Sequence, residues 1–123
     1  MTGASQRPGD DAEVCTTEAE GGLLQEWAVR CLARLFSTLS DPTRLQILTI
    51  LAGRNEITVG EITELVNLSI SAVSHQLGLL RDRDLVTARR SGRQVFYSLT
   101  DDHVRALLQT GIEHACGDCR QRR

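Results

Sequence analysis

The sequence contains no lysine and no run of apolar residues long enough to cross a membrane. A transmembrane helix needs about 20 predominantly apolar residues, and the opening segment MTGASQRPGDDAEV lacks the hydrophobic centre of a signal peptide. We therefore expect a cytoplasmic protein with no membrane partner. Because lysine is absent, all fourteen basic residues are arginine. Arginine suits bidentate contacts with phosphate and guanine, although genomic base composition is the simpler explanation of the bias.

Recognisable catalytic motifs are also absent. The chain has no glycine-rich phosphate-binding loop, and no Ser-His-Asp or Cys-His arrangement stands in a catalytic context. A zinc ion with an open coordination position can activate water, but no pattern indicates a substrate pocket. We therefore predict that the protein is not an enzyme.

The charge of the chain is unevenly distributed. The formal net charge is −2, yet residues 1–26 sum to −5 and the remaining 97 residues carry +3. With 41% apolar and 24% charged residues, the 123-residue chain has the composition of one folded domain. We predict a flexible acidic arm over residues 1–22, a folded domain over 23–117 and a tail over 118–123.

Apolar spacing predicts two helices at the start of the folded domain. From Leu23, apolar residues recur at intervals of three and four, which is typical of one long amphipathic helix. In the next helix Asp41 can cap the free amides, Pro42 suits the first position, and Gly53 ends the helix. The residues expected to face inward in this second helix are Leu45, Ile47, Leu48 and Leu51.

Two shorter helices follow, separated by a tight turn at Asn67-Leu68. The segment ITVGEITELV predicts the first, with Val59, Ile62, Leu65 and Val66 on its buried side. Ser69 or Ser71 can cap the second, SAVSHQLGLLRDRD, whose expected apolar stripe is Ile70, Val73, Leu77 and Leu80. Two short helices joined in this way indicate a helix-turn-helix.

The segment LVTARRSGRQVFYSL changes to alternating apolar and polar residues, and Ser91-Gly92 supplies a hairpin turn. No acid lies between Leu85 and Leu99, so the hairpin is basic. A last helix is expected from Asp101 or Asp102 to about Ala115. The resulting fold is mainly α with a two-stranded β-hairpin, in the order α-α-α-α-β-β-α of a winged helix-turn-helix.

Three segments, LSDPTRLQILTIL, SISAVSHQLGLLRDRDLV and RRSGRQVFYSL, resemble the ArsR/SmtB family of metal-responsive transcriptional repressors. The resemblance covers about residues 32–114. It implies a homodimer that forms through the first and last helices and binds a double-stranded DNA operator with an inverted repeat. It also implies that the metal-free dimer binds DNA, and that metal releases it and derepresses genes of metal efflux or sequestration.

Two groups of residues are expected to contact DNA. The helix Ser71 to Leu80 is the expected reader of the major groove, and the hairpin is expected to lie along the backbone or in the minor groove. The candidate contacts are Ser71, Ser74, His75 and Gln76 on the helix, and Arg89, Arg90, Arg93 and Gln94 on the hairpin.

Two histidines near the C-terminus carry the metal hypothesis. His103 and His114 are eleven residues apart, so on a helix they share one face but lie about 16 Å apart, too far for one ion. The antiparallel helices implied by the resemblance would bring Asp101 and His103 of one chain against His114 of its partner. Asp101 can converge with His103 only if it lies at or before the helix cap. The alternative is that His103 and His114 are ordinary surface residues and that Asp101 merely caps a helix.

An aspartate and two histidines suit Zn(II), and Co(II) accepts the same donors. The resembling family has a fourth ligand where this chain has Gly117, which offers no donor. Asp118 is our tentative fourth ligand, with water or a cysteine thiolate as alternatives. A second site of the family joins a cysteine in the arm to a cysteine at the first short helix; this chain has Cys15 in the arm but Thr58 at the helix position. Only Glu61 remains at that end, so we expect this site to be absent or weak.

Four cysteines, Cys15, Cys31, Cys116 and Cys119, allow a different chemistry. In a reducing cytoplasm they favour metal or thiol chemistry over disulfides. We expect Cys31 to be a small core residue. Cys116 and Cys119 share a helix face and, with Cys15, could bind Cd(II), Pb(II) or As(III), act as a thiol switch, or be incidental residues of a tail. Two alternatives therefore stay open: a thiol-based DNA-binding sensor, and a zinc-binding protein-interaction module.

Overall fold

The computed structural model describes residues 16–17 and 21–122, and it describes side chains for residues 21–117. The chain divides into two compact units, residues 1–37 and residues 38–123. Residues 1–15 and 18–20 lie outside the described part, so the predicted arm over 1–22 stays a prediction. No helix in the described residues is long and apolar enough to span a membrane.

The first unit contains a short antiparallel pair of strands and most of one helix. Strand β1 (Thr16–Thr17) pairs with β2 (Leu23–Leu24), and Gly21 and Gly22 take positive φ angles of 71° and 83° in the turn between them. Helix α2 (Glu26–Leu39) therefore begins three residues later than the expected Leu23, because strand β2 occupies the first two of these positions. Large apolar side chains along α2 are exposed in the single chain: Trp27, Val29, Leu32 and Phe36.

The second unit begins with helix α3 (Pro42–Ala52), whose ends follow the sequence signals. The Asp41 carboxylate accepts a hydrogen bond from the Arg44 amide at 2.9 Å, and Gly53 is the C-cap. Within α3, Ile47, Leu48 and Leu51 are fully buried, as expected.

Helices α4 (Val59–Val66) and α5 (Ile70–Asp82) form the helix-turn-helix. Asn67 closes α4 in the left-handed conformation (φ 57°), and the Ser69 hydroxyl caps α5 by accepting from the Ala72 amide at 3.1 Å. The buried contacts come from Ile62 on α4 and from Val73, Leu77 and Leu80 on α5.

Two residues predicted to be buried in these helices are exposed, so those predictions were wrong. Ile70 is 59% exposed because it is the first residue of α5, and the apolar stripe extends past the part of the helix that packs. Leu65 is 51% exposed, since buried Ile62 and half-buried Val66, four residues apart, mark the packed side of α4.

The hairpin consists of β4 (Val86–Ser91) and β5 (Gln94–Leu99), with Gly92 at φ 63° in the turn. A third strand that we did not predict, β3 (Ile57–Thr58), pairs antiparallel with β5, so that Ile57 lies opposite Tyr97. The sheet order is β3-β5-β4. β-Branched Ile57 and Thr58 suit an extended conformation, and they join the hairpin to the start of α4.

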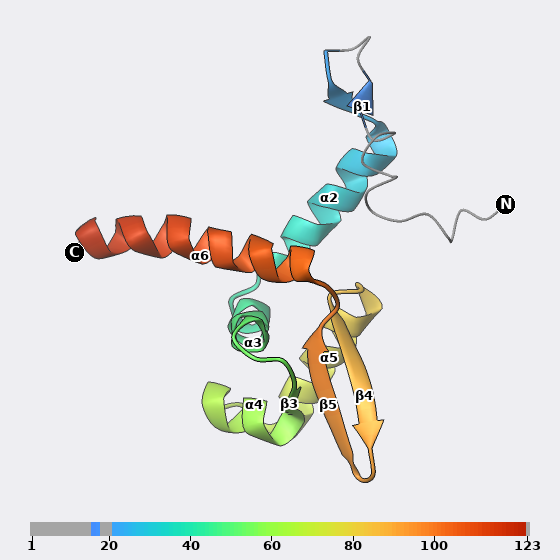
Figure 1. The fold of residues 1–123 in the computed structure, drawn as a ribbon, viewed down its shortest axis with the longest axis vertical. Coiled ribbons are helices and arrows are strands. Elements are labelled where there is room, and N and C mark those ends of the chain that lie inside the picture. The colour runs from blue at the N-terminus through green and yellow to red at the C-terminus, as the bar shows by residue number, and fades with distance from the viewer. Residues whose placement is uncertain (1–15, 18–20, 123) are drawn as a thin grey trace, which may run out of the picture. The chain divides into compact units, whose positions relative to one another are not determined.

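The last helix, α6 (Asp102–Arg122), packs on α3 at its beginning and then projects well past the rest of the second unit (Figure 1). It continues beyond the expected end near Ala115 and through most of the predicted tail 118–123. No proline interrupts this segment, and its arginine and glutamine residues favour a helix. The predicted winged helix-turn-helix is confirmed, with β3 as an addition.

Candidate nucleic-acid interface and metal centre

Helix α5 presents polar side chains on the face opposite its buried stripe. Ser71, Ser74 and His75 are exposed, as residues that contact a nucleic acid must be. Gln76 differs, because its side-chain oxygen is buried and has no hydrogen-bond partner among the described residues. Its side chain must therefore rearrange before that oxygen can read a base edge. The role of all four residues in DNA binding stays a prediction.

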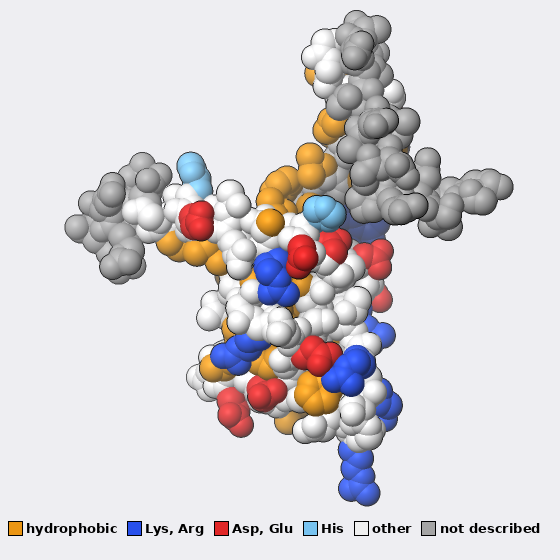
Figure 2. Space-filling model, viewed as in Figure 1, with side chains coloured by type: hydrophobic (Ala, Val, Ile, Leu, Met, Phe, Trp, Pro, Cys, Tyr) orange, Lys and Arg blue, Asp and Glu red, His pale blue; other side chains and the backbone are white. Residues whose placement is uncertain are grey.

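The hairpin carries exposed basic residues at its far end, where Figure 2 shows Lys/Arg side chains at the limit of the described surface. Arg90 and Arg93 are exposed, and so is Gln94 beside the turn. Neither Arg90 nor Arg93 takes part in an ion pair within the described part of the chain. The positive charges of these two arginines are therefore available for phosphate.

Arg89 is held differently from the other arginines of the hairpin. Its Nε and Nη2 atoms donate to the two carboxylate oxygens of Glu56 at 2.8 and 2.9 Å. Its guanidinium also lies over the ring of Phe96, 4.9 Å from the centroid, directly across the strand pair. The hydrogen bonds from Arg89 lower the pKa of Glu56 and raise the pKa of Arg89, so the pair is charged at neutral pH. Sequence reasoning missed Glu56 because it lies outside the hairpin.

The start of α4 is closed by a capping box. The Glu61 amide donates to the Thr58 hydroxyl at 3.3 Å, while the Thr58 amide donates to the Glu61 carboxylate at 2.9 Å. Hydrogen bonds from Thr58 lower the pKa of Glu61. Glu61, the one donor left from the second metal site of the resembling family, is therefore engaged in the fold of α4.

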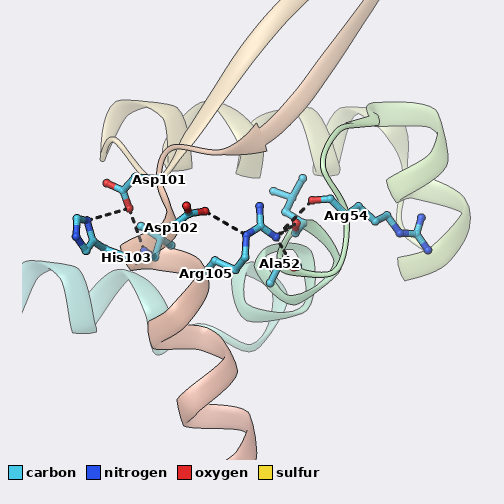
Figure 3. Close-up of polar contacts among 8 residues, drawn as sticks. Ala52, Arg54, Asp101, Asp102, His103 and Arg105 are labelled. Carbon is cyan, nitrogen blue, oxygen red and sulfur yellow. Dashed lines mark hydrogen bonds and ion pairs between the residues drawn. The ribbon is translucent and has the colours of Figure 1, made fainter.

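Two residues of the predicted metal site, Asp101 and His103, lie at the start of α6. Asp101 precedes the helix, and its Oδ1 accepts from the Val104 amide at 3.0 Å, so Asp101 is the cap, as convergence required. The same oxygen lies 3.8 Å from His103 Nδ1 (Figure 3). The His103 side chain is 82% exposed and that of Asp101 43% exposed. The cap thus turns two candidate donors toward one another at the surface.

The described donors His114 and Cys116 do not join this pair within one chain. His114 is exposed farther along α6, about 16 Å from His103 at helical rise. In the described ranges of a single chain, no group of three His, Cys, Asp or Glu residues could hold a metal ion. The side chains of Asp118 and Cys119, and the whole of Cys15, lie outside the described residues.

The two described cysteines are both exposed free thiols, Cys31 on α2 and Cys116 on α6. The expectation that Cys31 is a core residue was wrong for the single chain. It lies on a helix whose large apolar side chains are exposed as well.

Sequence comparison identifies the family of the chain. Residues 41–88 match the family model described as bacterial regulatory protein, arsR family. The transcriptional repressor SmtB homolog of Synechocystis sp. (strain ATCC 27184 / PCC 6803 / Kazusa) is 46% identical over 83 residues, which cover 68% of this chain and 62% of that protein. The HTH-type transcriptional regulator NmtR of Mycobacterium tuberculosis (strain ATCC 25618 / H37Rv) is 40% identical over 92 residues, covering 75% and 76%. The chain belongs to the ArsR/SmtB family of transcriptional repressors.

Solved structures of ArsR/SmtB-type regulators share the fold. The solution structure of apo-NmtR superposes with a TM-score of 0.67 at 40% identity, covering 75% of this chain and 76% of that chain. The crystal structure of the AntR antimony-specific transcriptional repressor gives a TM-score of 0.72 at 29% identity, covering 79% and 86%. These comparisons confirm the winged helix-turn-helix and the family resemblance. The relatives are regulators of transcription rather than enzymes.

Proposed function

We propose that the protein is a homodimeric repressor that binds an inverted-repeat operator when metal-free and leaves it when a Zn(II)-type ion binds between the two α6 helices. Asp101 and His103 of one protomer and His114 of the partner subunit hold the ion. The observation that carries the proposal is the cap at Asp101, which places its carboxylate 3.8 Å from His103 Nδ1. The regulated genes would serve metal efflux or sequestration.

The donors at the start of α6 fit a tetrahedral ion. Two ligands about 2 Å from one zinc ion lie about 3.3 Å apart, close to the observed separation of Asp101 and His103. The cap uses one lone pair of Asp101 Oδ1, which leaves its second lone pair and the whole of Oδ2 for a metal ion. His103 is exposed enough to adjust its side-chain angles. Gly117 supplies no donor, so Asp118, water or a thiolate would complete the set.

Exposed apolar side chains support the dimer that this site requires. Trp27, Leu32 and Phe36 on α2 are 44–50% exposed, and Ile112 on α6 is 41% exposed. Apolar side chains that line the outside of two helices are typical of a protein interface. A two-fold axis between antiparallel α6 helices would pair the start of one helix with His114 of the partner subunit and produce two equivalent sites.

DNA binding would use the exposed residues of α5 and of the hairpin. Ser71, Ser74 and His75 would enter the major groove, while Arg90 and Arg93 would contact phosphate. Arg89 would act mainly by fixing the hairpin, since Glu56 already neutralises it. Two reading heads in one dimer would recognise half-sites about one helical turn apart.

Titration of the reduced protein with Co(II), followed by visible absorption, tests the site. We expect intense tetrahedral d–d bands that are lost in His103→Ala and in His114→Ala. His75→Ala is the matched control, because His75 is an exposed histidine on α5, and it should keep the bands. Bands that survive both substitutions on α6 would contradict the proposal.

Mixing the two defective variants tests whether the site lies between subunits. When His103→Ala and His114→Ala chains are refolded together, half of the dimers are mixed, and each mixed dimer contains one complete site. About one quarter of the wild-type absorbance should therefore return. No recovery in a refolded dimer would show that the two histidines do not act across the interface.

A thiol-based sensor remains the second candidate, because Cys116 is an exposed thiol on α6 and the structural relative AntR is an antimony-specific repressor. A strong sulfur-to-cobalt charge-transfer band that persists without His103 and His114 would favour Cd(II), Pb(II), an arsenite-like ion or a thiol oxidant as inducer. Substitution of Cys116 would then abolish the response of DNA binding to that inducer.

A further inference from the structure

Arg105 reaches from the first turn of α6 to the end of α3 (Figure 3). Its Nη1 atom donates to the carbonyl oxygen of Ala52 and lies 3.4 Å from that of Leu51 and 3.5 Å from that of Arg54. Its side chain is 26% exposed, and its Nε lies 3.8 Å from an oxygen of the fully exposed Asp102. The carbonyl contacts are therefore the stronger attachment, because an exposed ion pair contributes little.

A positively charged donor is stabilising at the C-terminal end of α3. The last carbonyls of a helix have no partner within the helix and carry the negative end of its dipole. The amides of Gly53 and Arg54 satisfy Ile50 and Leu51. Arg105 then supplies the donor for the Ala52 carbonyl, which ties the two helices together across 53 residues of sequence.

Asp101 caps the first turn of α6, and His103 and Arg105 lie within that turn. Figure 3 shows Asp101 and His103 together on one side, and Arg105 turned toward α3. A helical turn moves as a unit because its backbone hydrogen bonds fix it. A displacement of the ligand pair therefore displaces the guanidinium of Arg105 as well.

The segment that Arg105 holds leads directly to both DNA-reading elements. Two residues after Arg54, Glu56 binds Arg89 of the hairpin through two hydrogen bonds. Thr58 then caps α4, the first helix of the helix-turn-helix. The loop between α3 and β3 is thus fixed to α6 at one end and to the hairpin and α4 at the other.

We propose that Arg105 is the positioning residue that transmits metal binding at the start of α6 to the reading elements, through the loop that contains Arg54 and Glu56. This rests on the proposed function, since it assumes a metal at Asp101 and His103. A dication bridging two subunits fixes the first turn of α6 in a new position. Arg105 carries that shift to the α3 end, and the hairpin and α4 follow.

The test measures how strongly metal and DNA binding are coupled in Arg105→Ala. The DNA is a duplex selected by the metal-free wild-type protein from a randomised pool, and its affinity is measured by fluorescence anisotropy with and without Zn(II). Effectors typically change affinity about 5- to 150-fold. We expect Arg105→Ala to keep the wild-type Co(II) spectrum and Co(II) affinity without DNA, while the Zn(II)-dependent change in DNA affinity falls by about tenfold toward no change.

Two further variants separate coupling from general damage. Arg105→Lys keeps a cation and donors within reach of the carbonyls, so it should retain most of the Zn(II) effect. Asp102→Asn removes the exposed ion pair and leaves the carbonyl contacts, so its Zn(II) effect should match the wild type. If Arg105→Ala does not fold, Arg105→Gln gives the same comparison, because it removes the charge and shortens the reach.

The outcomes distinguish the two proposals. A wild-type Zn(II) effect that persists in a folded Arg105→Ala or Arg105→Gln protein overturns the role of Arg105 and leaves the proposed function standing. If Zn(II) does not change the DNA affinity of the wild-type protein, the proposed function is wrong, and the proposed role of Arg105 is wrong with it. By reciprocity, DNA should weaken Co(II) binding in the wild type and much less in Arg105→Ala, which provides an independent readout.

Discussion

Glu56 and Arg89 are 33 residues apart in the sequence, and they join the loop after α3 to the hairpin through a bidentate pair with N–O distances of 2.8 and 2.9 Å. The pair fixes Arg89, the first basic residue of the hairpin, whereas Arg90 and Arg93 take part in none of the ion pairs of the described residues. The arginines that look equivalent in the sequence RRSGR therefore differ in their contacts. One is a structural contact, and two are available to a polyanion.

The first prediction concerns acid stability. Because Arg89 lowers the pKa of Glu56 below its ordinary value of 4.5, the pair stabilises the fold fully above that value and loses its contribution as the pH falls through the lowered pKa. Glu56→Gln should therefore be less stable than wild type at neutral pH, with the difference shrinking in acid. Urea unfolding at a series of pH values measures this, and a difference that grows toward low pH would contradict it.

The second prediction concerns the salt dependence of DNA binding. Each arginine that contacts one phosphate contributes about 0.9 to the slope of log K against log salt concentration. Arg90→Ala and Arg93→Ala should each reduce the slope by about that amount. Arg89→Ala should weaken binding with a smaller change in slope, because Glu56 already compensates its charge. Equal slope changes in all three variants would show that Arg89 breaks its ion pair with Glu56 in the complex and contacts phosphate itself.

The third prediction concerns the cap of α4. Thr58→Ala removes the hydroxyl that accepts from the Glu61 amide, and should lower the free energy of unfolding by about 1 kcal/mol. Thr58→Ser keeps an equivalent acceptor and serves as the control. Denaturant unfolding of the two variants makes the comparison, and equal losses would mean that the methyl group rather than the cap stabilises this position.

The fourth prediction concerns the turn of the helix-turn-helix. Asn67 has φ 57° at the end of α4, a conformation that asparagine and glycine tolerate and β-branched residues do not. Asn67→Val should destabilise the fold by about 1–3 kcal/mol, while Asn67→Gly should be close to neutral. Thermal unfolding distinguishes the two, and a stable Asn67→Val protein would show that the backbone can relax here.

The elements with local signals could be predicted from the sequence. The caps at Asp41 and Ser69, the end at Gly53 and the hairpin turn at Gly92 each depend on residues within a few positions, and all four are present. The sequence left Asp101 and Asp102 open as the start of the last helix, and the structure makes Asp101 the cap, which was the condition for its convergence with His103.

The features that sequence reasoning missed depend on distant partners. Strand β3 forms because Ile57 meets Tyr97 on β5, and neither residue signals the other. Arg105 is likewise an unremarkable arginine until α6 packs on α3. The exposure of Cys31 was also missed. An apolar helical stretch predicts that its residues are buried, but it does not show whether they are buried within the chain or against a second copy.

The strand order β3-β5-β4 also affects the tendency of the protein to aggregate at high concentration. Both outer strands of a sheet offer unpaired backbone groups to neighbouring molecules, which is a route to aggregation. Here one outer strand is only two residues long, and the other carries the exposed Arg90, which takes part in none of the ion pairs of the described residues. Short and positively charged edges discourage strand addition. The basic hairpin can therefore project into solvent without becoming a template for fibril-like assembly.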